Sequence, residues 1–315
     1  MKKIRVGVIG VGSLGQHHAR VFAELAGARL VGVADVDRAR AIAIAGRHGC
    51  RVVTDYRELL PDVEAVSVVT PTLLHHVIAR TCLAAGRHVL VEKPLAATVA
   101  EARDLVAAAA DRGVTLQVGH IERFNAAFRA TRGAIKDPTL IECRRWAPFT
   151  LRGADVDVVL DLMVHDLDLV LGLISAPVRE IQASGVSILS ATTDVAQARV
   201  VFQNGCVASF SANRVAESKL REVRILQPEG YVVIDLAQQT ASVGRRTMGT
   251  SGRYEVLTEQ VRGDGREPLK LELEAFLDAV RNGVQPLVSG REGAAALELA
   301  YAIINAIGTH SHHHG

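Results

Sequence analysis

The stretch Ile4-Arg-Val-Gly-Val-Ile9, followed directly by Gly10-Val-Gly12-Ser-Leu-Gly15, decides the fold of this chain. The first segment is short and mostly apolar, which predicts a buried β-strand. The residues that follow, Leu14–Glu24, have a helical pattern. Between such a strand and helix, Gly10 permits a tight turn, Gly12 lets the backbone approach a pyrophosphate, and Gly15 allows close packing. The stretch therefore predicts a dinucleotide cradle at the start of an α/β sheet.

Short Val-rich segments alternate with helical segments up to about Arg123. Repeated units of this kind predict a doubly wound parallel sheet with right-handed crossovers, the Rossmann arrangement. The expected strands are Ile4–Ile9, Arg29–Ala34, Ala65–Val69, Val89–Glu92 and Thr115–Val118. The expected helices are Leu14–Glu24, Arg38–His48, Leu74–Ala85 and Val99–Arg112.

The pattern changes after Arg123. Helices are expected at Asn125–Ile135, Val156–Ile174, Leu269–Arg281 and Arg291–Ile307. Alternating strands are expected at Val195–Phe202, Val207–Asn213, Glu222–Gln227 and Tyr231–Leu236, separated by glycine-containing turns. This order predicts an α+β domain on an open, mostly antiparallel sheet. The expected domains are residues 1–122 and 123–309, with a His-rich tail at 310–315 that is set aside.

Composition excludes several classes of protein. The 315 residues carry a formal net charge of +2 with interspersed signs, so no nucleic-acid-binding stripe is expected. No apolar run is long enough to predict a membrane span, and the glycine-broken start is unlike a signal peptide, so we expect a cytoplasmic protein. The four cysteines are widely spaced without a CxxC pair, which favours buried thiols over disulfides or a metal site.

Asp35 ends the second predicted strand, twenty residues after Gly15. An acid at this point accepts hydrogen bonds from a ribose diol and repels a 2′-phosphate, so NAD is expected over NADP. Arg38 could weaken that preference, and the plainer alternative for Asp35 is a helix N-cap. The pair His75-His76 is more often structural than catalytic. The candidate cofactor-binding residues are Gly10, Gly12, Ser13, Leu14, Gly15, Asp35, Thr70, Pro71, Thr72, His75, Glu92 and Lys93.

Two further groups are candidates for catalysis. Lys93 stands at the carboxyl end of a predicted strand, where open α/β sheets place their ligands. Asp161 and His165 are four residues apart, so on a helix they share one face, with Met163, Leu167 and Val170 packing on other faces. Alone, this spacing is more often a solvated acid beside a core histidine.

Together these motifs resemble the glucose–fructose oxidoreductase/inositol dehydrogenase (Gfo/Idh/MocA) family. The residues that carry the resemblance are Gly10–Gly15, Thr70-Pro71-Thr72, Glu92-Lys93-Pro94, Gly119-His-Ile-Glu-Arg123-Phe124-Asn125 and the pair Asp161 and His165. The resemblance implies a Rossmann domain, a last helix packing back on it, a Lys-Pro peptide that is often cis, and a homodimer or homotetramer formed through the open sheet. Within the family, the chain is most similar to nucleotide-sugar 3-dehydrogenases.

The implied reaction is NAD-dependent oxidation of a sugar ring hydroxyl to a ketone, at C3 of a UDP-N-acetylhexosamine. His165 is the better base by its intrinsic pKa, Lys93 the better stabiliser of an alkoxide, and Asp161 would orient His165 or bind a hydroxyl. Which of Lys93 and His165 acts as the base, and which stabilises the alkoxide, stays open. The candidate substrate-binding residues are Arg123, Asn125, Arg145, Arg152, Asp161 and His165. The alternatives are a free polyol, inositol or hexose dehydrogenase, and a dinucleotide-dependent regulator without turnover.

Overall fold

The computed structural model describes residues 2–150 and 156–311, so the candidate Arg152 lies outside the described residues. The chain forms two compact units. Unit 1 comprises the residues up to Ile121 together with Glu267–Leu297, and unit 2 comprises Glu122–Arg266 and the chain from Glu298 onward. The segment Glu267–Leu297, which the sequence pattern had grouped with the second domain, therefore belongs with the first unit.

Unit 1 is built on a parallel sheet, as predicted, and this sheet has six strands where the sequence predicted five. Its strands are β1 (Ile4–Ile9), β2 (Ala28–Ala34), β3 (Arg51–Val53), β4 (Ala65–Val68), β5 (His88–Glu92) and β6 (Leu116–Gly119). Their order is β3-β2-β1-β4-β5-β6, which is the order of a dinucleotide-binding Rossmann sheet. The chain reverses its winding between β1 and β4, so the crevice for a ligand lies at the carboxyl ends of these two strands.

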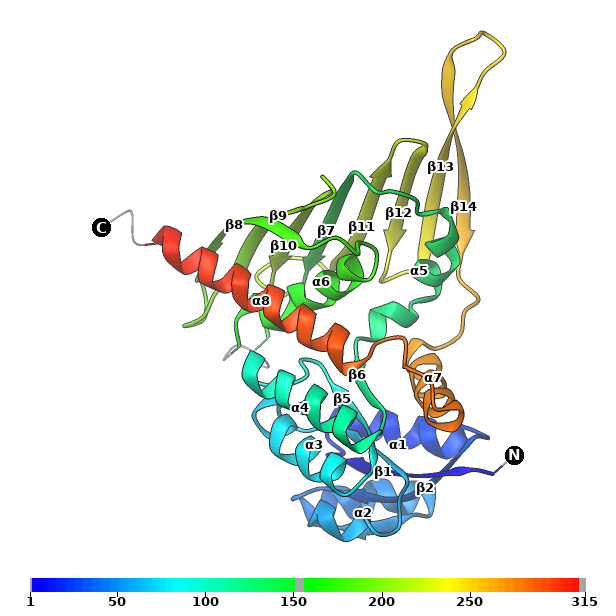
Figure 1. Ribbon diagram of the computed structural model, residues 1–315, viewed down its shortest axis with the longest axis vertical. Coiled ribbons are helices and arrows are strands. Elements are labelled where there is room, and N and C mark those ends of the chain that lie inside the picture. Colours follow the sequence, from blue (N-terminus) through cyan, green and yellow to red (C-terminus); the bar gives the residue numbers. More distant parts are fainter. Residues whose placement is uncertain (1, 151–155, 312–315) are drawn as a thin grey trace. The chain divides into compact units, whose positions relative to one another are not determined.

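The helices of unit 1 are α1 (Gly15–Glu24), α2 (Arg38–His48), α3 (His75–Ala84), α4 (Val99–Arg112) and α7 (Pro268–Asn282), with 3₁₀ turns at Tyr56–Leu59, Thr72–Leu74 and Ile121–Phe124. Local signals begin and end them: Thr98 and Glu101 form a capping box at α4, and Gly113 ends that helix in the left-handed conformation. α3 and α4 lie side by side, and α1 packs beside α7 (Figure 1). The apolar face of α7 joins the core of unit 1 through Leu269, Leu273, Phe276 and Leu277.

Unit 2 contains an eight-stranded sheet in the order β14-β13-β12-β11-β7-β10-β9-β8. The strands are β7 (Leu140–Trp146), β8 (Val178–Val186), β9 (Val195–Phe202), β10 (Val207–Asn213), β11 (Leu220–Gln227), β12 (Gly230–Asp235), β13 (Thr240–Met248) and β14 (Tyr254–Arg262). All neighbours are antiparallel except β7 and β10, which are parallel. Figure 1 shows β13 and β14 continuing past the other strands as a long hairpin.

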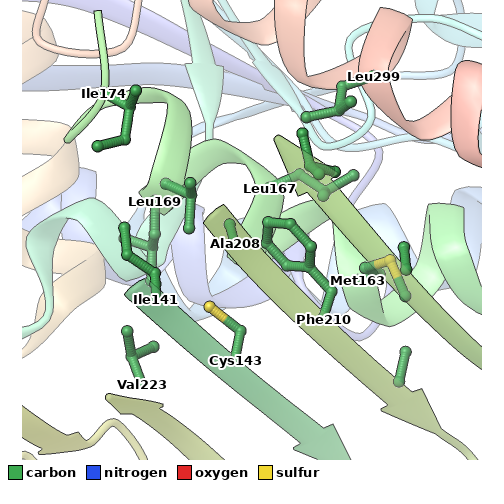
Figure 2. Packing of buried hydrophobic residues seen from close by; sticks show 14 of the residues in the cluster. Ile141, Cys143, Met163, Leu167, Leu169, Ile174, Ala208, Phe210, Val223 and Leu299 are labelled. Carbon is green, nitrogen blue, oxygen red and sulfur yellow. The ribbon is translucent and has the colours of Figure 1, made fainter. Parts of the chain in front are cut away.

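Helices cover one face of this second sheet. They are α5 (Ala126–Thr131), a 3₁₀ turn at Arg132–Ala134, a π-helical turn at Val159–Met163 that leads into α6 (Val164–Leu171), and the later part of α8 (Gly290–Ser311). Figure 2 shows Leu167 of α6, Phe210 of β10 and Leu299 of α8 together in the core. Met163, Leu167 and Val170 are buried there, as predicted. In the part of the chain that the structure describes, no helix is long and apolar enough to cross a membrane.

Candidate active site

The glycine turn between β1 and α1 has the shape of a phosphate cradle. Gly10 has a φ of +84°, and a Cβ there would collide with the backbone of Val69 at the end of β4. A Cβ on Gly15 would in turn overlap with the carbonyl of Gly10, so close packing requires both glycines. A Cβ on Gly12 would instead meet open space. The turn therefore leaves room at Gly12 for a ligand above the amino terminus of α1, where backbone amides favour an anion.

Asp35 at the end of β2 binds the glycine turn itself. Its Oδ2 accepts the backbone N–H of Val11 at 2.9 Å, and its Oδ1 accepts the N–H of Asp37 at 2.9 Å. The helix cap of α2 is Asp37, which accepts the N–H of Arg40, so the N-cap alternative for Asp35 is wrong. The arginine beside Asp35 is Arg40, whose Nη1 lies 3.4 Å from Oδ2, rather than the exposed Arg38.

Thr70, Pro71 and Thr72 follow β4 on the opposite side of the glycine turn. The Thr70 hydroxyl is buried and has no hydrogen-bond partner among the described residues. Pro71 is exposed, and Thr72 starts a short 3₁₀ turn that leads into α3. A buried hydroxyl without a protein partner is well suited to bind a polar group of a bound ligand.

His75 at the start of α3 is buried, and its ring bridges two loops. Nδ1 lies 2.8 Å from the carbonyl oxygen of Pro94, and Nε2 lies 2.9 Å from that of Thr70. Burial lowers the pKa of His75, while the two carbonyls and the charge of Glu92 oppose that shift. The ring thus holds the Thr70 turn beside the Lys93-Pro94 segment, and a contribution to cofactor binding would act through these two backbones.

Lys93 follows β5 and is half-buried, and the Lys93–Pro94 peptide is cis. Glu92 turns its carboxylate inward. Oε1 lies 3.1 Å from Nε2 of His18 on α1, and Oε2 accepts the backbone N–H of Lys93 at 3.2 Å. The other ring nitrogen of His18 lies 2.8 Å from the hydroxyl of Ser67 on β4. A chain of polar groups therefore runs from the middle of the sheet to Lys93.

The ionisation of Glu92 reflects this environment. Burial opposes the charge of the carboxylate, but the hydrogen bond and the nearby positive charge of His18, with the N–H of Lys93, more than offset it. The net result is a Glu92 pKa below its ordinary value. Gly119 on β6 makes room for the group, because a Cβ there would lie 2.9 Å from the carboxylate.

In unit 2, Asp161 lies within the π-helical turn Val159–Met163, and His165 lies in the first turn of α6. Both side chains are half-buried, while Asp166 to Val170 are buried. Both side chains are therefore partly accessible, in a helical segment whose later residues are buried. No sequence pattern predicted the π-turn, which is a local irregularity often found at functional sites.

Three predicted substrate ligands instead bind protein groups in unit 2. Arg123 forms a buried two-point ion pair with Asp168, with Nε 2.6 Å from Oδ2 and Nη2 3.1 Å from Oδ1. Arg145 binds Asp166, with 2.7 Å from Nη2 to Oδ1, and also binds Glu122. The pKa of Arg145 is raised, since these carboxylates outweigh its burial.

Asn125 caps α5 by accepting the N–H of Ala127, and it donates to the carbonyl of Leu236 at 2.9 Å. It is buried, like Arg123 and Arg145. The contacts of the two arginines are buried ion pairs. All three side chains already have protein partners that fix the frame around α6.

The residues that the sequence analysis missed are His18 and Ser67. His18 is the second histidine of Gln16-His17-His18 in α1, and it is buried while its neighbour His17 is exposed. The available signal was a histidine on the sheet-facing side of the helix that opens the dinucleotide cradle. Among the described residues, no group of three His, Cys, Asp or Glu side chains is arranged to hold a metal ion.

Comparisons with known proteins agree with this geometry. Residues 4–120 match the model of an oxidoreductase family with an NAD-binding Rossmann fold, and residues 102–233 match that of the GFO/IDH/MocA C-terminal domain. The chain is 37% identical over 309 residues to UDP-N-acetylglucosamine 3-dehydrogenase of Acidithiobacillus ferrooxidans, covering 96% of this chain and 98% of that protein.

A solved structure of UDP-N-acetylglucosamine 3-dehydrogenase from the same organism matches with a TM-score of 0.93 at 36% identity, covering 98% of this chain and 99% of the other. Inositol 2-dehydrogenase 1 of Saccharopolyspora erythraea is 30% identical over 337 residues, covering 96% of this chain and 94% of that protein. Both relatives are therefore similar along almost the whole chain.

Proposed function

Because this chain belongs to the GFO/IDH/MocA family of oxidoreductases, we propose that it is an NAD-dependent dehydrogenase acting on C3 of a UDP-N-acetylhexosamine. The reaction converts the ring hydroxyl to a ketone. The observation that carries the proposal is the 37% identity to UDP-N-acetylglucosamine 3-dehydrogenase across 96% of this chain. The substrate class follows from that relative, and the dehydrogenase chemistry is shared by the family.

The residues of unit 1 fit a bound dinucleotide. Open space at Gly12 and the amides at the start of α1 lie after β1, and the buried hydroxyl of Thr70 lies after the neighbouring strand β4. Asp35 stands at the end of β2, where a ribose diol would donate to its carboxylate. A nicotinamide cofactor held by these residues would supply the hydride acceptor for the oxidation.

The protein's own residues handle the proton. We assign His165 to take the proton of the hydroxyl, since an imidazole titrates near neutral pH. Asp161 would hold His165 in orientation. Lys93 is assigned to stabilise the negative charge that develops on an oxygen during the reaction. Loss of a hydride and a proton converts the alcohol to the ketone. The other two products are NADH and a protonated His165.

Asp35 supports NAD over NADP, because its carboxylate would repel a 2′-phosphate. In Asp35→Ser, NAD affinity should fall about tenfold, with the loss of hydrogen bonds to a charged group, and the preference over NADP should shrink. Asp37→Ser is the matched control. Asp37 caps α2 with its side chain, so Asp37→Ser should change stability by less than about 1 kcal/mol while cofactor preference stays the same. Unchanged cofactor preference in Asp35→Ser would contradict the assignment.

We further propose that the enzyme works in the cytoplasm as a homodimer or homotetramer associated through the open face of the second sheet. Exposed strand residues such as Gln182, Gln197 and Arg199 line that face and offer polar contacts. Light scattering with size-exclusion chromatography measures the assembly. A monomer at micromolar concentration would contradict this part of the proposal.

The deciding experiment mixes the protein and NAD with UDP-N-acetylglucosamine, UDP-N-acetylgalactosamine, free N-acetylglucosamine, glucose or myo-inositol, and follows NADH. Turnover of a UDP-sugar without turnover of the free sugar supports the proposal. Turnover of myo-inositol or glucose alone supports the second candidate, a polyol or hexose dehydrogenase, which the 30% identity to an inositol 2-dehydrogenase favours. Cofactor released by denaturing the protein is measured in parallel, so that tightly held NADH is counted.

A further inference from the structure

We propose that His18 is a positioning residue of the active site: joined to Ser67, it holds the Glu92 carboxylate negatively charged and in one orientation against the backbone of Lys93. This inference rests on the proposed function, because Lys93 is the residue whose setting it controls. His18, Ser67, Glu92 and Lys93 all belong to unit 1.

The backbone of Lys93 and the side chains of Glu92, His18 and Ser67 form a series of polar contacts. The N–H of Lys93 donates to Oε2 of Glu92, and Nε2 of His18 lies 3.1 Å from Oε1. A charged carboxylate only accepts hydrogen bonds, so the hydrogen of this contact lies on Nε2. The other ring nitrogen, Nδ1, lies 2.8 Å from the hydroxyl of Ser67.

The Glu92 carboxylate lies in a buried space between residues of neighbouring elements of unit 1. The side chain of Glu92 is 13% exposed and that of His18 is 2% exposed. On the remaining side, Gly119 of β6 leaves space that a Cβ would fill. A buried ion pair of this kind contributes little to stability, because desolvation cancels most of the attraction. Its consequence is electrostatic: a fixed negative charge one residue from the lysine that contacts the reacting oxygen.

The groups that face Glu92 come from several elements. They are His18 on α1, the neutral hydroxyl of Ser67 beyond it on β4, Lys93 after β5, and His75 on α3, whose ionisation is coupled to the charge of Glu92. The side chain of His18 contacts the carboxylate directly, with 3.1 Å between Nε2 and Oε1. Removing it therefore makes the buried carboxylate easier to protonate.

The test compares His18→Leu, which removes both contacts, with His18→Gln, which keeps a donor for Glu92. His17→Gln on the exposed side of α1 is the matched control. In His18→Leu, we expect kcat/KM at neutral pH to fall about 10- to 100-fold, the loss of a hydrogen bond to a charged group. The acid limb of the pH profile should move to higher pH. His18→Gln should recover most of the activity at neutral pH, and His17→Gln should match the wild type.

A second readout does not depend on turnover. In protein labelled with ¹³C at the glutamate side-chain carboxyl, the Glu92 signal is assigned by Glu92→Gln and titrated by NMR. Its midpoint should lie at higher pH in His18→Leu than in the wild type and His17→Gln. If His18→Leu does not fold, Ser67→Ala, which frees the ring of His18, should shift the midpoint in the same direction by less.

Equal midpoints in the wild type and in the variants of His18 and Ser67 overturn the inference, whatever the activity. A wild type that oxidises none of the sugars offered overturns the proposed function instead, and the NMR titration still decides the role of His18. The two proposals therefore fail on different measurements.

Discussion

Arg123→Met tests whether a buried arginine of unit 2 serves the fold or the substrate. The guanidinium of Arg123 lies 2.6 Å and 3.1 Å from the two carboxylate oxygens of Asp168. The two side chains are 8% and 1% exposed. Gly172 packs against the same guanidinium, since a Cβ there would overlap with it. Removing the arginine therefore leaves the Asp168 carboxylate buried without its counter-charge.

The expected cost is about 3–5 kcal/mol of unfolding free energy, the range for breaking one side of a buried ion pair. For a domain of about 150–250 residues, this lowers the melting temperature by roughly 6–20 °C. The double variant Arg123→Met/Asp168→Leu should recover much of the loss, because no charge stays buried. Differential scanning calorimetry measures all three proteins.

Arg129→Met on α5 is the matched control, because Arg129 and Asp264 form an exposed pair with 3.6 Å between Nη1 and Oδ2. Its loss should change stability by at most about 1 kcal/mol. The reasoning is refuted if Arg123→Met keeps the wild-type melting temperature and raises KM for the sugar nucleotide. Arg123 would then bind substrate, as the sequence alone suggested.

Lys93→Met should lower kcat by about 10²–10⁴ if the lysine acts on the reacting oxygen, while NAD affinity measured by calorimetry stays close to that of the wild type; near-normal turnover would remove Lys93 from the mechanism. Gly12→Ala should keep the melting temperature and weaken NAD binding, because its Cβ would occupy open space where the ligand would lie. Gly10→Ala should lower the melting temperature, because alanine at this positive φ carries backbone strain of about 1–3 kcal/mol. Burial lowers the pKa of His75, so the unfolded chain binds more protons and stability should fall as pH drops below about 6.5 toward the folded-state pKa. His75→Gln should flatten that slope in pH-dependent calorimetry, and His17→Gln at an exposed position should not. Equal slopes in all three proteins would contradict the argument.

Much of unit 1 was predictable because its signals are local. The bounds of β1, α2 and α4 match the predicted ranges residue for residue, since apolar periodicity, capping residues and glycine stops lie within each segment. β3 escaped prediction because three residues are too short to show a period. In unit 2, β7, β8, β13 and β14 were also missed, and the parallel pairing of β7 with β10 was hidden because the two strands lie far apart in the sequence.

The residues of the candidate site also fall into two groups, those with a local sequence signal and those without one. The glycine turn, Asp35 and Lys93 were identified because their motifs have a fixed spacing from a strand end. The partners of buried polar groups were not, since Arg123 and Asp168 are 45 residues apart, and His18 and Glu92 are 74 residues apart. No local sequence pattern predicts a contact between residues that lie so far apart in the sequence.

The sequence by itself determined the doubly wound sheet, the dinucleotide cradle and the chemical class, because glycine geometry and strand–helix periodicity are properties of neighbouring residues. Only the tertiary structure decided which polar side chains face a ligand and which are neutralised inside the protein. Burying an unpaired charge costs free energy. The buried arginines, histidines and carboxylates therefore pair with polar groups that the fold places beside them. That is why Arg123 and Arg145 are paired within unit 2, and why His18 emerged beside Glu92.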